Sequence, residues 1–207
     1  MLGASPESPR MFQSDFVDFF SRIPWWVVPL LYVPTTLAFV ALSVRAGVSA
    51  GVVALEVGLG WLTWTLLEYW LHRTVFHWVP KAWWGERFHF FLHGVHHQWF
   101  NDRYRLVMPP AVSITIAVLL FSAMSVVAGM LAAWLDPSWV YATFAGIVLG
   151  YMVYDCTHYY IHHAKPRTRL GLALRAHHNK HHHNPRYADL KYGVSSTLWD
   201  HVFRTYD

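Results

Sequence analysis

Four long apolar segments place the strongest constraint on the fold of this chain. They cover residues 25–44, 47–71, 110–135 and 138–160. A helix needs about 20 residues to cross the hydrocarbon core of a bilayer, because each residue adds about 1.5 Å. The chain has 207 residues and is 55% hydrophobic, and a soluble domain of this size has too small an interior for so much apolar surface. We therefore expect an all-α integral membrane protein with four transmembrane helices.

The positive residues set the expected orientation of these helices. Of the 16 Lys and Arg residues, 15 fall in the two terminal segments and the loop between the second and third apolar segments. Positive residues concentrate on the cytoplasmic side of membrane proteins. Both termini are thus predicted to be cytoplasmic, in the inner membrane of a bacterium or the endoplasmic reticulum of a eukaryote.

We expect one domain over residues 1–207. Residues 72–108 and 161–207 are predicted to form a cytoplasmic, histidine-rich helical cap. Residues 1–24 are predicted to lie at the membrane interface, because phenylalanines recur there at helical spacing. These phenylalanines are Phe12, Phe16, Phe19 and Phe20.

Ten of the 15 histidines form four clusters with the spacing of metal ligands. They are His72 and His77; His93, His96 and His97; His158 and His162; and His178, His181 and His182. Residues three and four apart share one face of a helix, which fits three of these clusters. His72 and His77 are five apart, and an ideal α-helix would splay them by about 140°. This pair indicates either a helix end or two metals that each take one of the two residues.

Ten imidazoles can supply two metal ions with five ligands each. The sixth position on each ion would stay open for O₂ or substrate, as catalysis requires. Imidazole binds iron, zinc, copper and nickel alike, but iron activates O₂ whereas zinc has no redox chemistry. We expect two iron ions in the working protein, with zinc able to occupy the same sites in a purified sample. A single histidine at a membrane edge is more often an interface residue, but ten in four spaced clusters are not explained that way.

Four carboxylates are candidates for the hydrogen bonds that metal-bound histidines usually donate through their other ring nitrogen. They are Glu68, Asp155, Asp102 and Asp200. Glu68 lies four residues before His72, so one helical turn brings them together. Asp155 lies three residues before His158, and Asp102 and Asp200 flank the remaining clusters. We expect no catalytic side chain beyond the metal ligands.

Several stretches of the chain resemble the fatty acid hydroxylase superfamily, and more narrowly its fatty acid 2-hydroxylases. The matching stretches are LEYWLHRTVFH, FFLHGVHH, RLVMPP, GYMVYDCTHYYIHH, HHNKHHH and YGVSSTLWDHVFRT. Desaturases and sterol oxidases share the histidine motifs. The stretches without histidine ligands, RLVMPP and GVSSTLWD, are more specific to the hydroxylases.

The resemblance implies a division of the ligands between two metals. One metal would be bound by His72, His93, His96, His178 and His181, and the other by His77, His97, His158, His162 and His182. His177 and His183 adjoin the last cluster and are possible substitutes for its members. Relatives often have proline where Phe100 stands.

The resemblance also implies O₂-dependent hydroxylation of a lipid acyl chain at carbon 2, in a fatty acid or a ceramide. Some relatives carry a fused cytochrome b₅ domain with a His-Pro-Gly-Gly motif, which this sequence lacks. A separate electron donor is therefore expected, either cytochrome b₅-like or a ferredoxin with its reductase. The other expected partners are the acyl lipid and the membrane, and no nucleic acid.

Two other functions remain open from the sequence. A lipid desaturase or sterol oxidase would use the same di-iron site. A membrane protein for metal transport or storage would also bind metals, but transporters place ionisable ligands near the bilayer midplane. Only Glu56 lies deep in an apolar segment here, which disfavours transport.

Overall fold

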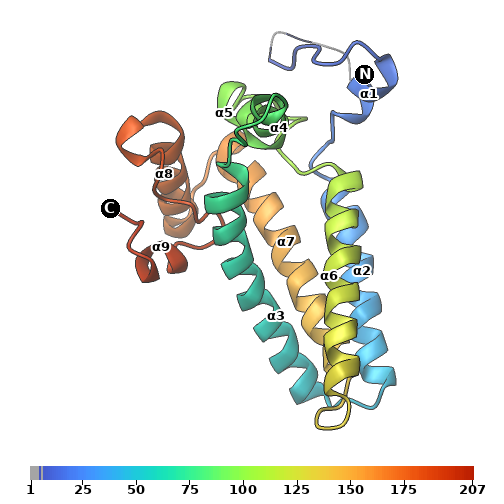
Figure 1. Cartoon of the computed structure of the whole chain (residues 1–207). Helices are drawn as coiled ribbons and strands as arrows, with labels where there is room; N and C mark the ends of the chain where they lie inside the picture. Colours follow the sequence, from blue (N-terminus) through green and yellow to red (C-terminus); the bar gives the residue numbers. More distant parts are fainter. Residues whose placement is uncertain (1–4, 6) are drawn as a thin grey trace. The chain divides into compact units, whose positions relative to one another are not determined.

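The computed structural model describes Ser5 and residues 7–207, and all regular structure in this part of the chain is helical. Four long helices dominate it (Figure 1). They are α2 (Val27–Arg45), α3 (Ala50–Trp70), α6 (Pro110–Leu131) and α7 (Trp139–His163). The shorter elements are α1 (Asp15–Phe20), the π-helix η1 (Leu71–Phe76), α4 (Gly85–His89), the π-helix η2 (Phe90–Gly94), α5 (Val95–Gln98), α8 (Arg169–His183), the 3₁₀-helix η3 (Pro185–Tyr187) and α9 (Leu198–Val202). The predicted all-α class is confirmed.

The number of membrane spans is also as predicted. Four helical segments are long and apolar enough to cross a membrane, and they cover Val27–Arg45, Ala50–Phe76, Pro110–Leu131 and Trp139–His163. The second span runs five residues beyond its predicted end because η1 continues α3 without a break. The third ends earlier than expected, at Leu131.

The chain divides into two compact units. The histidine unit comprises residues 1–25, 65–109 and 154–207, and the span unit comprises residues 26–64 and 110–153. The division falls within α3 and within α7, so each of these helices contributes residues to both units.

Glycines allow α3 and α7 to approach closely inside the span unit. A Cβ atom at Gly60 would lie 2.0 Å from the carbonyl oxygen of Thr143, and one at Gly146 would lie 2.1 Å from the carbonyl oxygen of Val57. A larger residue at either position would force the two backbones apart. Close backbone contact of this kind is a main source of helix association in membranes, where lipid weakens the hydrophobic effect between helices.

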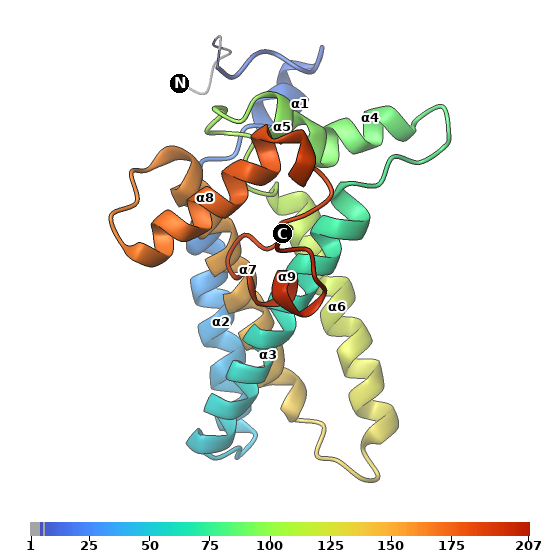
Figure 2. The same ribbon diagram turned by 90° about the vertical axis from the view of Figure 1, so that its left-hand side faces the viewer.

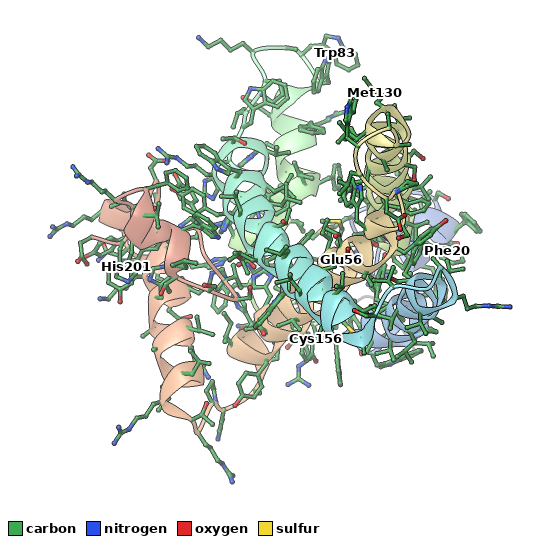
Figure 3. All side chains as sticks on the ribbon, turned by 90° about the horizontal axis from the view of Figure 1, so that it is seen from below. Phe20, Glu56, Trp83, Met130, Cys156 and His201 are labelled. Carbon is green, nitrogen blue, oxygen red and sulfur yellow. The ribbon has the colours of Figure 1, made fainter. Side chains whose placement is uncertain are left out.

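Aromatic rings join α2, α6 and α7 within the same unit. The centroids of Phe39, Phe121 and Phe144 lie 4.7–5.0 Å apart. The hydroxyl of Tyr32 donates a hydrogen bond to Ser113 Oγ at 2.6 Å. Helix α6 also carries largely exposed apolar side chains, such as Met130, which is 71% exposed and points outward in Figure 3. This uncovered apolar surface fits a helix that faces lipid.

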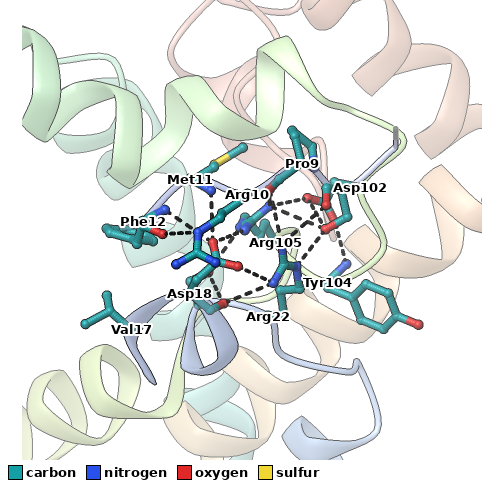
Figure 4. Close-up of polar contacts among 12 residues, drawn as sticks. Pro9, Arg10, Met11, Phe12, Val17, Asp18, Arg22, Asp102, Tyr104 and Arg105 are labelled. Carbon is teal, nitrogen blue, oxygen red and sulfur yellow. Dashed lines mark hydrogen bonds and ion pairs between the residues drawn. The ribbon is translucent and has the colours of Figure 1, made fainter. Parts of the chain in front are cut away.

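A buried ionic network ties the N-terminal segment into the histidine unit (Figure 4). Asp18 pairs with Arg22 at 2.5 Å and with Arg105 at 3.2 Å. Arg105 also pairs with Asp102 at 3.0 Å, and Ser8 donates its hydroxyl to Asp102 at 2.9 Å. These contacts anchor the N-terminal segment to the loop that follows the second histidine cluster.

The predicted interfacial segment contains one short helix, α1. Its Phe16, Phe19 and Phe20 side chains are at least half exposed. Residues 1–4 and 6 of this predicted segment lie outside the described residues. Its position at a membrane interface stays a prediction.

Candidate metal centre

All ten clustered histidines meet in the histidine unit, in two groups of five. Within each group the potential ligand atoms all lie within 4.8 Å of one another. The first group consists of His72, His77, His93, His97 and His181. The second group consists of His96, His158, His162, His178 and His182. The two groups adjoin, since the rings of His97 and His182 stack with centroids 4.1 Å apart.

Four Nε2 atoms of the second group form a closed ring. The successive distances are 3.1 Å from His96 to His158, 3.0 Å from His158 to His178, 3.0 Å from His178 to His182, and 2.9 Å from His182 back to His96. Two nitrogens that each lie about 2.1 Å from one ion are about 3.0 Å apart at a right angle, and about 3.4 Å apart at the tetrahedral angle. The observed spacing fits four ligands in a square around one ion. His162 then supplies the fifth nitrogen.

The first group shows the same spacing. His72 Nε2 lies 3.1 Å from His93 Nε2, which lies 2.9 Å from His97 Nε2. The Nε2 atoms of His77 and His181 are 3.1 Å apart. Both groups therefore fit an ion with ligands at right angles and a coordination number above four.

The π-helix η1 explains how His72 and His77 come to lie in the same group. In a π-helix the hydrogen bonds span five residues instead of four, so residues five apart come close to alignment along the axis. His72 lies in the π-helix η1 and His77 ends it. Both residues serve the first group, so a division between two metals does not explain their spacing. The predicted helix end is present, since His77 is the C-cap of η1, and the π-helical turn brings the two residues to the same side.

The two groups also contradict the division of the ligands between two metals that the family resemblance implies. In both His-x-x-His-His motifs, the first and last histidines share one group and the middle one joins the other. His93 and His97 thus belong together and His96 does not, while His178 and His182 belong together and His181 does not. The physical reason is that residues four apart lie closest on one helix face, whereas the residue three along points to the neighbouring ion.

Backbone carbonyls hold two histidines of the first group. His72 Nδ1 donates to the Tyr192 carbonyl at 2.6 Å, and His181 Nδ1 donates to the Leu190 carbonyl at 2.8 Å. A carbonyl can only accept, so Nδ1 carries the proton and Nε2 presents its lone pair to the group. In the second group, no described residue partners the buried Nδ1 atoms of His158, His178 and His182.

Burial keeps these imidazoles neutral. It lowers the pKa of His77 to about 4 and that of His97 to about 3, and in both cases the neighbouring His181 lowers the pKa further. Burial likewise lowers the pKa of His93, His96 and His178 well below its ordinary value. Neutral imidazole is the form that binds metal, so the protein presents its ligands ready for coordination.

A cavity of about 400 Å³ opens onto the first group. It is lined by His77, His93, His97 and His181 of the first group and by His182 of the second. The rest of its wall consists of His89, His183, Asn184, Pro185, Ala188 and Asp189. This wall combines polar and apolar surface.

Each of the four predicted carboxylates binds a group other than the ten clustered histidines. Glu68 accepts from the backbone amides of Val194 and Ser195, and Asp155 accepts from the amide of Met108 at 3.1 Å. Asp102 belongs to the N-terminal ionic network. Asp200 pairs with His177, at 3.1 Å, which lies outside both groups. The role of these four side chains beside the ligands stays a prediction.

Sequence reasoning missed the carbonyls of Leu190 and Tyr192. A backbone carbonyl leaves no signal in the residue type, so only the fold reveals it. The structure also settles the ambiguity in the last cluster, since His177 and His183 both lie outside the two groups.

Comparison with known proteins agrees with this geometry. The model of the fatty acid hydroxylase family matches residues 57–205. The chain belongs to this family. A solved structure of full-length scs7p, in which only the hydroxylase domain is visible, shares 32% sequence identity with the chain and superposes with a TM-score of 0.85. That match covers 97% of this chain and 72% of the other.

Several characterised family members are similar over most of this chain. The dihydroceramide fatty acyl 2-hydroxylase FAH2 of Arabidopsis thaliana is 39% identical over 96% of this chain and 80% of its own length. The ceramide very long chain fatty acid hydroxylase SCS7 of Saccharomyces cerevisiae is 34% identical over 93% of this chain and 48% of its own length. The human fatty acid 2-hydroxylase is 33% identical over 95% of this chain and 56% of its own length.

Proposed function

We propose that this chain hydroxylates carbon 2 of a lipid acyl chain, using two iron ions, O₂ and electrons from a separate donor protein. The coarser part of this statement, an integral membrane oxidoreductase that hydroxylates lipid acyl chains, follows from the family and the four apolar spans. The position on the acyl chain is supported by the relatives, which are fatty acyl 2-hydroxylases. A ceramide acyl chain is the favoured substrate because two relatives from Arabidopsis thaliana are dihydroceramide fatty acyl 2-hydroxylases.

One observation carries the metal assignment. Two adjoining groups of five imidazoles place neighbouring Nε2 atoms 2.9–3.1 Å apart, with no carboxylate or thiolate among them. Neutral nitrogens with lone pairs directed at one point repel one another unless a cation lies between them. Ten such ligands fit two ions, each with one coordination position left for a reactant.

The reaction balances with one O₂, two electrons and two protons. The C–H bond at carbon 2 becomes a C–OH bond, and the other oxygen atom leaves as water. Iron, when bound, supplies the redox chemistry that O₂ activation needs, and zinc does not. The protein would hold the ions in fixed positions through its histidines, and the cavity lined by four histidines of the first group gives small molecules access to that group.

The proposed orientation places the metal centre on the cytoplasmic side. It is supported by the charge distribution, since 15 of the 16 Lys and Arg residues flank the apolar spans on one side. A cytoplasmic donor, cytochrome b₅-like or a ferredoxin with its reductase, would then reach the centre directly.

The test is expression of the chain in cells that lack 2-hydroxylated lipids, followed by mass spectrometry of the extracted lipids. Hydroxylation adds one oxygen atom to the acyl chain, whereas desaturation removes two hydrogens. Cells grown under isotopically labelled O₂ should incorporate the label at carbon 2. Purified protein should contain two metal ions per chain, and activity should follow its iron content and not its zinc content.

A matched control is the His93→Ala variant, which removes one ligand of the first group. It should accumulate to the same level in the membrane and yield no labelled product. Unsaturated products, or label-free lipids from well-expressed wild-type protein, would contradict the proposed function.

A further inference from the structure

The loop of residues 190–196 holds two ligands of the first group through its backbone. The Tyr192 carbonyl accepts from His72, and the Leu190 carbonyl accepts from His181. Loops of this kind are usually mobile unless their backbone groups find fixed partners. The orientation of both imidazoles therefore depends on what holds this loop.

Two buried carboxylates accept hydrogen bonds from four consecutive backbone amides of the loop. Asp200 accepts from the amides of Tyr192 at 2.9 Å and Gly193 at 2.8 Å. Glu68 accepts from the amides of Val194 at 2.7 Å and Ser195 at 2.8 Å. Asp200 is fully buried and Glu68 is 3% exposed, so neither bond competes with water.

The peptide unit between Tyr192 and Gly193 links Asp200 to a metal ligand. A peptide unit is rigid and planar, and its N–H and C=O point in opposite directions. The Gly193 N–H of this unit donates to Asp200, and its Tyr192 C=O accepts from His72. Fixing one side of the plane therefore fixes the other.

The space around Gly193 leaves no room for a side chain at this position. A Cβ atom there would lie 2.0 Å from the Ser196 carbonyl oxygen and 2.7 Å from the Asp200 carboxylate. Glycine thus permits the approach that the bond to Asp200 requires. The peptide between Leu190 and Lys191, whose carbonyl accepts from His181, is held at its other side by the Lys191 amide, which donates to the Thr205 carbonyl at 2.8 Å.

We propose that Asp200 is a positioning residue for the first metal, acting on His72 through the Tyr192–Gly193 peptide, and that Glu68 completes the clamp on the loop. The arrangement has the same logic as the carboxylate–histidine–metal triads of other metalloproteins, with one peptide unit inserted. A carboxylate that accepts from the N–H polarises the peptide, which makes its carbonyl a stronger acceptor for the histidine. This role rests on the proposed two-metal function.

The experiment compares metal binding by full-length wild-type protein and its Asp200→Asn variant. Metal-free protein in detergent is titrated with Co²⁺, whose absorption reports ligand geometry, in competition with a chelator. Removing an outer partner of a ligating histidine weakens metal binding by about 10- to 100-fold. We expect the Asp200→Asn variant to show this weaker binding for one of the two ions, together with a changed Co²⁺ spectrum. Its affinity for the other ion should stay unchanged.

Asp102→Asn is the matched control. Asp102 is as deeply buried in the same unit and accepts from Ser8 and Arg105, but it has no link to a histidine of either group. Its variant should melt at a lower temperature and keep both affinities. A purely structural role for Asp200 would lower both affinities together and leave the shape of the Co²⁺ spectrum unchanged.

A milder variant covers the case in which Asp200→Asn does not fold. Ser195→Ala removes only the hydroxyl that donates to Glu68, and it should weaken the same ion by less than about tenfold. Unchanged binding of both ions in whichever variants fold would overturn the proposal. Wild-type protein that binds two ions without making hydroxylated lipid would contradict the proposed function alone.

Discussion

The two units of this protein are stabilised by different interactions. The span unit relies on close packing, with glycines in backbone contact and a cluster of three phenylalanine rings. The histidine unit relies on buried polar connections between segments far apart in sequence, such as the ion pairs of Asp18 and the carboxylate clamps on residues 192–195. Its C-terminal segment, drawn in red in Figure 2, turns back so that Lys191 and Thr205 pair through their backbones.

The difference matches the task of each unit. Apolar packing tolerates small adjustments, because dispersion and burial depend weakly on direction. Hydrogen bonds and ion pairs in a buried site are directional and costly to leave unmade, so they fix one arrangement. Metal ligands need that precision, whereas helices that cross a bilayer need mainly complementary surfaces. Changes at the metal ligands and at the loop that holds them should therefore affect metal binding, whereas changes elsewhere, including those in the span unit, should affect stability alone.

The largest expected effect follows from His93→Ala. Loss of this ligand should remove the metal of the first group and reduce hydroxylated product below detection, while helix content stays as in the wild type. Metal analysis, circular dichroism and lipid mass spectrometry on the same preparation test this. His201→Ala makes the same change at an exposed ring outside both groups and should retain metal and activity. Loss of helix content in the His93 variant would show that the two units are not independent.

Asp18→Ala should produce the next largest effect. It leaves the buried guanidinium groups of Arg22 and Arg105 without their shared carboxylate. Breaking a buried ion pair by removing one partner costs about 3–5 kcal/mol. Thermal unfolding of the metal-free protein should show this loss, and a melting temperature equal to that of the wild type would show that these ion pairs do not stabilise the histidine unit.

Asp18 should also make the stability of the folded protein depend on pH. Burial alone would raise the pKa of Asp18, but hydrogen bonds from the Met11 and Phe12 amides and from Arg22 outweigh it and lower the pKa to about 2 from an ordinary value of 3.8. A lowered carboxyl pKa stabilises the folded state above the ordinary value, and the stabilisation is lost as the pH falls toward the folded pKa. Wild-type protein should therefore lose stability between about pH 4 and pH 2 more steeply than Asp18→Asn. Parallel unfolding curves for the two proteins would rule out this role.

Gly146→Ala should have a smaller effect, confined to the span unit. The added methyl group would meet the Val57 carbonyl oxygen at 2.1 Å, and overpacking of this kind costs about 1–3 kcal/mol. The melting temperature should fall while the folded fraction keeps two metal ions per chain. Gly129→Ala is the control, because a Cβ atom there has nothing within 4 Å.

The sequence predicted the spans and the histidines well because both depend on composition and local spacing. Apolar runs of sufficient length have few alternatives to a membrane helix. Histidines four apart, such as His158 and His162, align on any α-helix. These features need no knowledge of tertiary contacts.

The parts that failed depend on long-range geometry. The π-helical turn at His72 and His77 has no clear sequence signature, so the spacing left open that each residue serves a different metal, and the division implied by the family resemblance separated the two. Glu68 lies one turn from His72 but binds a loop more than 120 residues away. The position of Glu68 on the helix predicted that it lies near His72, but it did not predict which groups Glu68 binds.

The smallest expected effect comes from Tyr32→Phe, which removes one hydroxyl from the span unit. Tyr32 donates to Ser113 at 2.6 Å, and this bond joins α2 to α6. Hydrogen bonds between membrane helices contribute about 0.6 kcal/mol on average, because the separated helices also find partners. The melting temperature should therefore change only slightly, and metal content and activity should not change. A loss as large as that of Gly146→Ala would mean that directional bonds hold the span unit too, which would remove the distinction between the two units.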